Sequence, residues 1–405
     1  MRILVSAYAC EPGRGSEPGV GWSWAREIAR FHEVWVITRA NNRGPIESAQ
    51  AMEPLPNVHW VYLDLPRWAC FWKKGQRGIR AYYFLWQVGA YFTGRRLHRK
   101  IGIDLIHHVT LGIYWIPSFL PLLPIPFVWG PVGGGESAPR PFWYAFSLRG
   151  KFYELFRDLG RLIGNLNPMV RLNARRAVVT LSKSMDTKRK LEALGAPRVL
   201  LYSEVGLPAD EIHRLKTSGL SQHDTFRLVS VGNLLHLKGF EFGIRAFALF
   251  RVHFANSEYW LIGDGPERKR LQKLARTLGV ADSVHFLGSM SRTQVLDRLL
   301  QCDVLVHPSL HDSGGWTCVE AMATGRAVIC LDLGGPAVQV TEETGIKIPA
   351  LSPRQVIRDL ATAMSQLSED PVRREQLGKT ARERVAQHFS WDEKGLLINR
   401  IYSQR

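Results

Sequence analysis

The segment from Val304 to Ala323 holds the residues whose types and spacing best suit ligand binding or catalysis. An apolar run ends in a polar turn containing Gly314 and Gly315, and a helix-favouring run follows at once. A strand, turn and helix in this order direct backbone N–H groups and a positive helix end at an anion. Asp312 and Glu320 frame the turn. Amides between two carboxylates suit a ligand that carries both phosphate and hydroxyl groups, such as a nucleotide sugar.

This segment resembles the E-x7-E signature of the retaining glycosyltransferases of family 4, with Asp312 where the family usually has the first Glu. The resemblance implies that Asp312 contacts the transferred sugar and that Glu320 accepts hydrogen bonds from the ribose hydroxyls. Other segments resemble the family in the same order along the chain: Phe226–Lys238, Tyr259–Glu267, Val284–Gly288 and Ala327–Gly335.

The turn before the predicted helix supplies candidate donor-binding groups. The N–H groups of Gly315, Trp316 and Thr317 are candidates to hold the phosphates or the sugar. The glycines at 314 and 315 permit a close backbone approach that a side chain would block.

Lys238 is the candidate cation for a diphosphate, because it follows an apolar strand after a short loop. In the family an Arg usually lies five positions earlier and shares this task. The chain has Asn233 there, an uncharged donor, so diphosphate affinity should be lower unless another cation such as His236 substitutes.

In the N-terminal half, the glycine-rich loop Gly13–Gly21 follows the first strand and includes Gly15 and Ser16. The resemblance favours a role for this loop over the donor diphosphate. His107 and His108 end a later strand, where the family usually places a histidine that touches the donor sugar. Strand alternation directs the two rings to opposite sides, so we expect only one to face a ligand.

Short apolar strands recur between helical patterns through both halves of the 405-residue chain. Near-continuous Val, Ile and Leu runs predict parallel strands covered on both faces. We therefore expect an α/β fold of two doubly wound, Rossmann-like domains facing across a cleft, which is the GT-B architecture of the family. The expected domains are residues 1–205 and 206–385, followed by a helix over 386–405 that returns to the first domain.

The net charge of +17 indicates an anionic partner. Pro66–Lys100 carries nine basic residues among nine aromatic ones, a composition typical of segments that lie on an anionic bilayer. Two alternatives remain open: a solvated basic face over an ordinary aromatic core, and stacking on single-stranded nucleic acid. No fold signature of a nucleic-acid-binding protein is present, so we expect no nucleic-acid partner.

Five prolines interrupt the uncharged stretch Leu105–Gly135, so we do not expect it to span a membrane. The five cysteines lack C-x-x-C spacing and no signal peptide precedes them, which favours reduced thiols in the cytoplasm. The pattern of potential ligands predicts neither a metal nor another cofactor. We expect a cytoplasmic protein, peripheral at the inner face of the plasma membrane.

These expectations combine into a retaining, metal-independent hexosyltransferase that uses a nucleoside diphosphate sugar. Its expected acceptor is a saccharide or lipid-linked saccharide in surface polysaccharide or glycolipid synthesis. Asn233 and Asp312 depart from the family's pattern and keep open a non-catalytic subunit that binds sugar nucleotides. A phosphorylase or an epimerase would share the architecture, but no motif around a pyridoxal lysine is seen.

Overall fold

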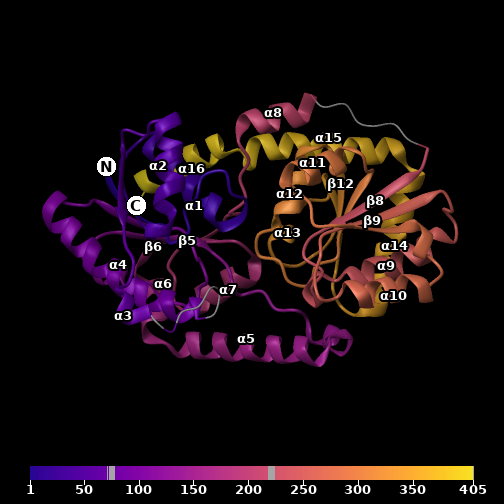
Figure 1. The fold of residues 1–405 in the computed structure, drawn as a ribbon, viewed down its shortest axis with the longest axis horizontal. Helices are drawn as coiled ribbons and strands as arrows, with labels where there is room; N and C mark the ends of the chain where they lie inside the picture. Colours follow the sequence, from indigo (N-terminus) through magenta and orange to yellow (C-terminus); the bar gives the residue numbers. More distant parts are fainter. Residues whose placement is uncertain (71, 73–77, 218–223, 405) are drawn as a thin grey trace. The chain divides into compact units, whose positions relative to one another are not determined.

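The computed structural model describes residues 1–70, 72, 78–217 and 224–404. The chain divides into two compact units (Figure 1). Unit 1 comprises Met1–Gly135, Arg157–Gly206 and Trp391–Arg405, and unit 2 comprises Glu136–Phe156 and Leu207–Ser390. The division at Gly206 lies beside the predicted boundary, whereas Glu136–Phe156 groups with the second unit rather than with the first.

Unit 1 is built on a parallel sheet in the order β3-β2-β1-β4-β5-β6-β7. Large aromatic side chains such as Trp86 and Trp129 fill its core. The strands are β1 (Arg2–Ser6), β2 (Glu33–Thr38), β3 (Val58–Tyr62), β4 (Leu105–His108), β5 (Phe127–Val132), β6 (Ala177–Ser182) and β7 (Val199–Leu201).

Unit 2 is built on a second parallel sheet, in the order β10-β9-β8-β11-β12-β13. Its core includes Phe247, Phe250 and Tyr259. The strands are β8 (Phe226–Val231), β9 (Ser257–Ile262), β10 (Val284–Gly288), β11 (Val304–His307), β12 (Ala327–Leu331) and β13 (Gly345–Ile348). The expectation of two Rossmann-like α/β domains is confirmed.

Helices connect the parallel strands, as crossover connections require. Unit 1 contains α1 (Ser16–Ala29), α2 (Arg43–Met52), α3 (Arg67–Cys70), α4 (Ile79–Ile101), α6 (Pro168–Arg176), α7 (Met185–Ala193) and α16 (Trp391–Ser403). Unit 2 contains α8 (Ala209–Thr217), α9 (Phe240–Arg251), α10 (Arg268–Thr277), α11 (Arg292–Leu300), α12 (Trp316–Ala323), α13 (Gly334–Gln339), α14 (Pro353–Glu369) and α15 (Pro371–His388). The remaining helix, α5 (Leu148–Leu166), begins in unit 2 and ends in unit 1.

Each sheet has a point where the strand order reverses, between β1 and β4 in unit 1 and between β8 and β11 in unit 2. Ligands of doubly wound folds bind at the carboxyl ends of strands beside such a point. In unit 2 the loop after β8 leads to Lys238, and the loop after β11 contains Asp312. Strand order therefore brings together residues that are far apart in the sequence.

The structure divides the aromatic residues of Pro66–Lys100 between the core and the surface. Tyr82, Tyr83 and Trp86 are buried, so the prediction that the aromatic side chains of this segment face a bilayer is wrong for these three. Trp68 and Phe92 are exposed. Phe71, Lys73, Lys74 and Arg77 lie outside the described residues. Among the helices that the structure describes, none has the length and apolar character needed to span a bilayer.

Candidate active site

Lys238 and Asp312 meet at the carboxyl ends of β8 and β11. The ammonium of Lys238 lies 2.6 Å from Oδ2 of Asp312, and both side chains are partly buried. A short 3-10 turn, His236–Lys238, carries the lysine and ends at Gly239, whose φ is +65°. A Cβ at Gly239 would lie 1.9 Å from the carbonyl oxygen of Pro308, so the close approach of these two loops requires glycine.

The second oxygen of Asp312 accepts hydrogen bonds from the turn that precedes α12. Gly314 and Gly315 donate their N–H groups to Oδ1 over 3.2 and 3.0 Å. His307 at the end of β11 places Nε2 at 3.3 Å from Oδ2. Burial alone would raise the pKa of Asp312, but Lys238 and His307 outweigh it and hold the pKa well below its ordinary value. The Asp312 carboxylate is therefore ionised at neutral pH.

The N-terminus of α12 is shaped by two glycines and a buried glutamine. Gly315 has a φ of +65°, and a Cβ there would lie 2.3 Å from Oε1 of Gln339. Gln339 donates its side-chain amide to the carbonyl oxygen of Gly314. Trp316 and Thr317 form the first turn, where N–H groups have no partner within the helix. The predicted donor-binding amides therefore lie in one turn next to Asp312, which already accepts the N–H of Gly315.

Glu320 is buried on α12 and is bonded to an arginine that the sequence analysis did not identify. Nε of Arg292 donates to Oε1 of Glu320 over 2.7 Å, and its terminal nitrogens donate to both oxygens of Glu211 over 2.6 and 2.8 Å. Burial raises the pKa of Glu320, and the charge of Arg292 opposes that rise. Arg292 precedes Glu320 by 28 positions, and no spacing rule links the two.

The loop after β8 exposes Asn233 but encloses His236. The imidazole of His236 lies edge-on to Phe146, with ring centroids 4.9 Å apart, and its Nε2 is 3.8 Å from Oε1 of the buried Glu154. His236 is thus packed against Glu136–Phe156 and is not placed to replace the family's missing arginine.

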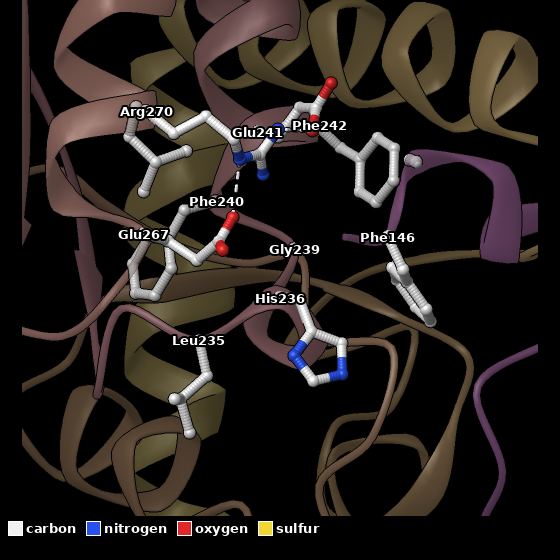
Figure 2. A pocket seen from close by; sticks show the side chains of 11 residues that line it. Phe146, Leu235, His236, Gly239, Phe240, Glu241, Phe242, Glu267 and Arg270 are labelled. Atoms are coloured by element: carbon white, nitrogen blue, oxygen red, sulfur yellow. Dashed lines mark hydrogen bonds and ion pairs between the residues drawn. The ribbon is translucent and has the colours of Figure 1, made fainter. Parts of the chain in front are cut away.

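Figure 2 shows the small cavity beside this loop, with His236 and Phe146 on one side and the paired Glu267 and Arg270 on the other. Its volume of about 10 Å³ accommodates no more than one water molecule. It therefore cannot hold a nucleotide.

In unit 1, Gly15 and Ser16 lie at the start of α1, after the loop that follows β1. Both are exposed, and Ser16 has a φ of +63°. A non-glycine residue in this left-handed region stores backbone strain of the kind found at ligand-binding loops.

His107 is buried in the core of unit 1. Its Nε2 lies 2.7 Å from the carbonyl oxygen of Gly130, and its Nδ1 lies 2.6 Å from the hydroxyl of Tyr402 on α16. Burial lowers the pKa of His107 to about 4, so the ring is neutral at physiological pH.

His108 is buried on the other side of β4. Its Nε2 lies 2.9 Å from the hydroxyl of Tyr83 and its Nδ1 lies 3.2 Å from Oγ of Ser6. Burial lowers the pKa of His108 to about 3, and the electrostatic effect of His107 contributes less. Contrary to the prediction, both ring nitrogens of each histidine are engaged within unit 1, because this sheet is covered on both faces. We assign both rings to packing.

A further charged cluster in unit 1 was missed from the sequence. Lys183 follows β6 directly, is buried and is ion-paired with Glu204. Burial raises the pKa of Glu17, and the nearby charge of Lys183 opposes that rise. The sequence feature that could have indicated this cluster is a lysine at the end of an apolar strand.

No metal-binding cluster is found in the described part of the chain. No three His, Cys, Asp or Glu side chains converge there as a metal ion would require. The five cysteines form no disulfide bond, and burial raises the pKa of Cys318 in α12 well above its ordinary value. The Cys318 thiol is therefore protonated and poorly suited to act as a nucleophile.

Residues 212–384 match the protein family described as Glycosyl transferases group 1. The lipopolysaccharide core biosynthesis glycosyltransferase LpsD of Rhizobium meliloti (strain 1021) is 32% identical over 167 residues, which cover 41% of this chain and 46% of LpsD. The 2-deoxystreptamine glucosyltransferase of Streptomyces kanamyceticus is 29% identical over 204 residues, which cover 48% of this chain and 51% of that enzyme. The chain thus spans about half the length of these relatives.

Solved structures resemble the chain over its whole length. Sucrose-phosphate synthase from Thermosynechococcus elongatus has a TM-score of 0.63 at 19% identity, covering 100% of this chain and 98% of that one. HepE of Anabaena in complex with UDP has a TM-score of 0.63 at 16% identity, covering 100% of both chains. At these identities the likeness concerns the fold, which is that of the GT-B glycosyltransferases.

Proposed function

We propose that the chain is a retaining, metal-independent glycosyltransferase that moves a hexose from a nucleoside diphosphate sugar to a saccharide or lipid-linked acceptor. The observation that carries this proposal is the pairing of Lys238 with Asp312 beside the N–H groups of Gly314 and Gly315. A cation, an ionised carboxylate and a helix N-terminus meet there, within the region that matches Glycosyl transferases group 1.

The charges of this site suit the departure of a diphosphate. The ammonium of Lys238 would exchange part of its contact with Asp312 for the phosphate oxygens, whose negative charge grows as the sugar leaves. The first turn of α12 would add N–H groups to the same anion. Asp312, ionised and shorter than glutamate, would accept hydrogen bonds from sugar hydroxyls rather than supply a proton.

Retention follows in this proposal from attack on the face that the diphosphate leaves. The acceptor hydroxyl forms the new C–O bond while the bond to the diphosphate breaks, and the departing phosphate oxygen takes the hydroxyl proton. No protein nucleophile is needed, so the contribution of the protein is positioning and stabilisation of charge. Glu320, held by Arg292, would accept the ribose hydroxyls. Gly15 and Ser16 of unit 1 remain predicted contacts of the diphosphate.

The surface of α4 bears on the acceptor and on the cellular location that we propose. Phe92, Arg95, Arg96, Arg99 and Lys100 line an open hollow on α4. Basic and aromatic groups together suit the surface of an anionic membrane, so we place the enzyme at the cytoplasmic face of the plasma membrane in surface polysaccharide or glycolipid synthesis.

A screen of thermal stability against UDP-, GDP- and ADP-sugars tests donor binding, because a ligand at a hundred times its Kd stabilises by about 2.7 kcal/mol. Slow hydrolysis of the stabilising donor without acceptor would support catalysis. Stabilisation without turnover in the presence or absence of saccharide acceptors would instead favour a subunit that only binds sugar nucleotides. Absence of any shift would overturn both assignments.

A further inference from the structure

Helix α5 exposes a continuous apolar face. Its apolar residues recur at helical spacing and are between 49% and 75% exposed: Leu148, Phe152, Leu155, Phe156, Leu159, Leu162, Ile163 and Leu166. Scattered exposed apolar residues are normal in a water-soluble protein, but a contiguous row along one helix marks an interaction surface.

The opposite face of α5 is polar and buried. Glu154, Arg157 and Arg161 point inward and are less than 8% exposed. Arg161 donates from Nε to the carbonyl oxygen of Gly134 over 2.9 Å within unit 1. The helix is therefore turned opposite to an ordinary amphipathic helix, whose apolar face covers the core.

Close backbone packing fixes α5 in this orientation at both ends. A Cβ at Gly164 would lie 2.3 Å from Cβ of Trp115 in unit 1, and a Cβ at Gly150 would lie 3.0 Å from the ring of His236 in unit 2. At Gly164 only glycine allows this approach, whereas at Gly150 the ring of His236 would have to shift by a few tenths of an ångström. The apolar face therefore cannot turn inward without losing the close packing at Gly164. Each half of α5 is thus fixed to its own unit by its polar side.

The charges around α5 favour an anionic occupant. Residues 137–185 contain nine Lys and Arg, of which Arg157, Arg161 and Lys183 are buried, but only two carboxylates, Glu154 and Asp158. Glu154 is fully buried, and Asp158 is paired with Arg161 over 3.0 Å. Arg171 on α6 is exposed, and its Nε donates to the carbonyl oxygen of Asn165 near the C-terminal end of α5. The exposed face therefore combines apolar contact area with a positive surrounding.

We propose that α5 is a membrane-docking helix, which lies flat on an anionic lipid surface with its row of leucine and phenylalanine side chains among the lipid tails. A helix of 19 residues is roughly 28 Å long, and interfacial helices bury their apolar face about 5–10 Å deep. Helix α5 would be a second membrane-binding element besides the hollow on α4. This proposal rests on the proposed function and deepens it, because it specifies how the enzyme would reach a lipid-linked acceptor.

The test compares vesicle binding of the full chain and of two triple variants. One variant carries Phe152→Glu, Phe156→Glu and Ile163→Glu, all at exposed positions of α5. The matched control carries Leu249→Glu, Val252→Glu and Val372→Glu, which are exposed apolar positions elsewhere and change the net charge equally. The vesicles contain phosphatidylcholine with roughly one third phosphatidylglycerol, or phosphatidylcholine alone.

We expect the wild type and the control to sediment with the anionic vesicles, and the α5 variant to bind them about a hundredfold or more weakly. A Phe156→Trp variant should show a shift of its emission to shorter wavelength with these vesicles. Wild-type protein that stays in the supernatant, or an α5 variant that binds like the control, would overturn the proposal.

Two further measurements separate this proposal from its alternatives. Light scattering without lipid gives the oligomeric state: a wild-type dimer that becomes monomeric in the α5 variant would assign the face to a second copy of the chain and overturn membrane docking. Thermal stabilisation by sugar nucleotides should be the same in the α5 variant and the wild type. Its absence in both proteins, with vesicle binding intact, would contradict the proposed function but not the docking helix.

Discussion

Arg292 donates from Nε to Oε1 of Glu320 over 2.7 Å while its two terminal nitrogens hold Glu211. The carboxylate predicted to accept the ribose hydroxyls is therefore already positioned by a guanidinium from another helix. Burial raises the pKa of Glu320, and the charge of Arg292 is the main effect that opposes that rise. Ribose recognition at this site should depend on Arg292 as much as on Glu320.

Replacing Arg292 by Gln should weaken nucleoside diphosphate binding, measured by calorimetry with UDP, GDP and ADP. Removal of the cation should also lower the free energy of unfolding by about 1–3 kcal/mol, less than for a fully buried pair because Arg292 is 37% exposed. Arg298→Gln on the same helix is the control, since Arg298 donates to Oε1 of Gln301 and lies over the ring of Trp260. Unchanged nucleotide affinity in Arg292→Gln would contradict the positioning role.

Replacing Lys238 by Ala should reduce turnover while the protein stays folded. A charge-assisted contact that strengthens in the transition state contributes about 2–4 kcal/mol, which corresponds to a loss of kcat of roughly 30- to 1,000-fold. Lys347→Ala is the matched control, because Lys347 faces Asp332 at 3.8 Å elsewhere in unit 2. Activity of Lys238→Ala within about threefold of wild type would refute the assignment.

Replacing Asn233 by Arg should tighten nucleoside diphosphate binding by roughly tenfold, because it restores the second cation of the family's pattern. The position is exposed, so the larger side chain has room. Asn233→Gln adds length without charge and should leave the affinity unchanged. Weaker binding in a folded Asn233→Arg protein would show that another group already occupies that place.

The buried histidines of β4 should make unit 1 sensitive to acid. Because the pKa values of His107 and His108 are lowered to about 4 and 3, the unfolded chain binds more protons than the folded one below the ordinary histidine pKa. Their contribution is fully present above about pH 6.5 and declines as the pH falls toward 4.

Denaturant unfolding at successive pH values measures this slope. His107→Gln and His108→Gln should each flatten it by up to about 1.4 kcal/mol per pH unit. His253→Gln changes an exposed histidine and should leave the slope of stability against pH unaltered. Ring signals of His107 or His108 that titrate near pH 6.5 in NMR spectra would contradict the burial argument.

The two parallel sheets could be predicted from the sequence because runs such as Val304–Val306 are apolar at every position, as is typical of strands covered on both faces. β7 and β13 are short and lie at the edges of their sheets, so their sequences carry little of this signal. Lys238 and Asp312 were recognised through a resemblance, whereas their direct pairing depends on the adjacency of β8 and β11.

Other features could not be derived from the sequence for identifiable reasons. The residues of α5 show a clear helical period, but periodicity alone does not say which face lies inward, and here the usual direction is reversed. The spacing of Arg292 gives no sign of its contact with Glu320, because the two lie on different helices. At His107 and His108, alternation predicted opposite directions correctly, but both directions lead into the core.

Unit 1 is completed by α16, whose Tyr402 contacts His107 and whose Lys394 donates to the carbonyl oxygen of Ser203. On the ribosome, the stretch that builds most of unit 2 therefore emerges before these closing contacts of unit 1 can form. The domain begun first in translation is finished last, and until then its nascent chain exposes the buried surface that α16 will cover. Chaperone protection during synthesis should consequently matter more for unit 1 than for unit 2.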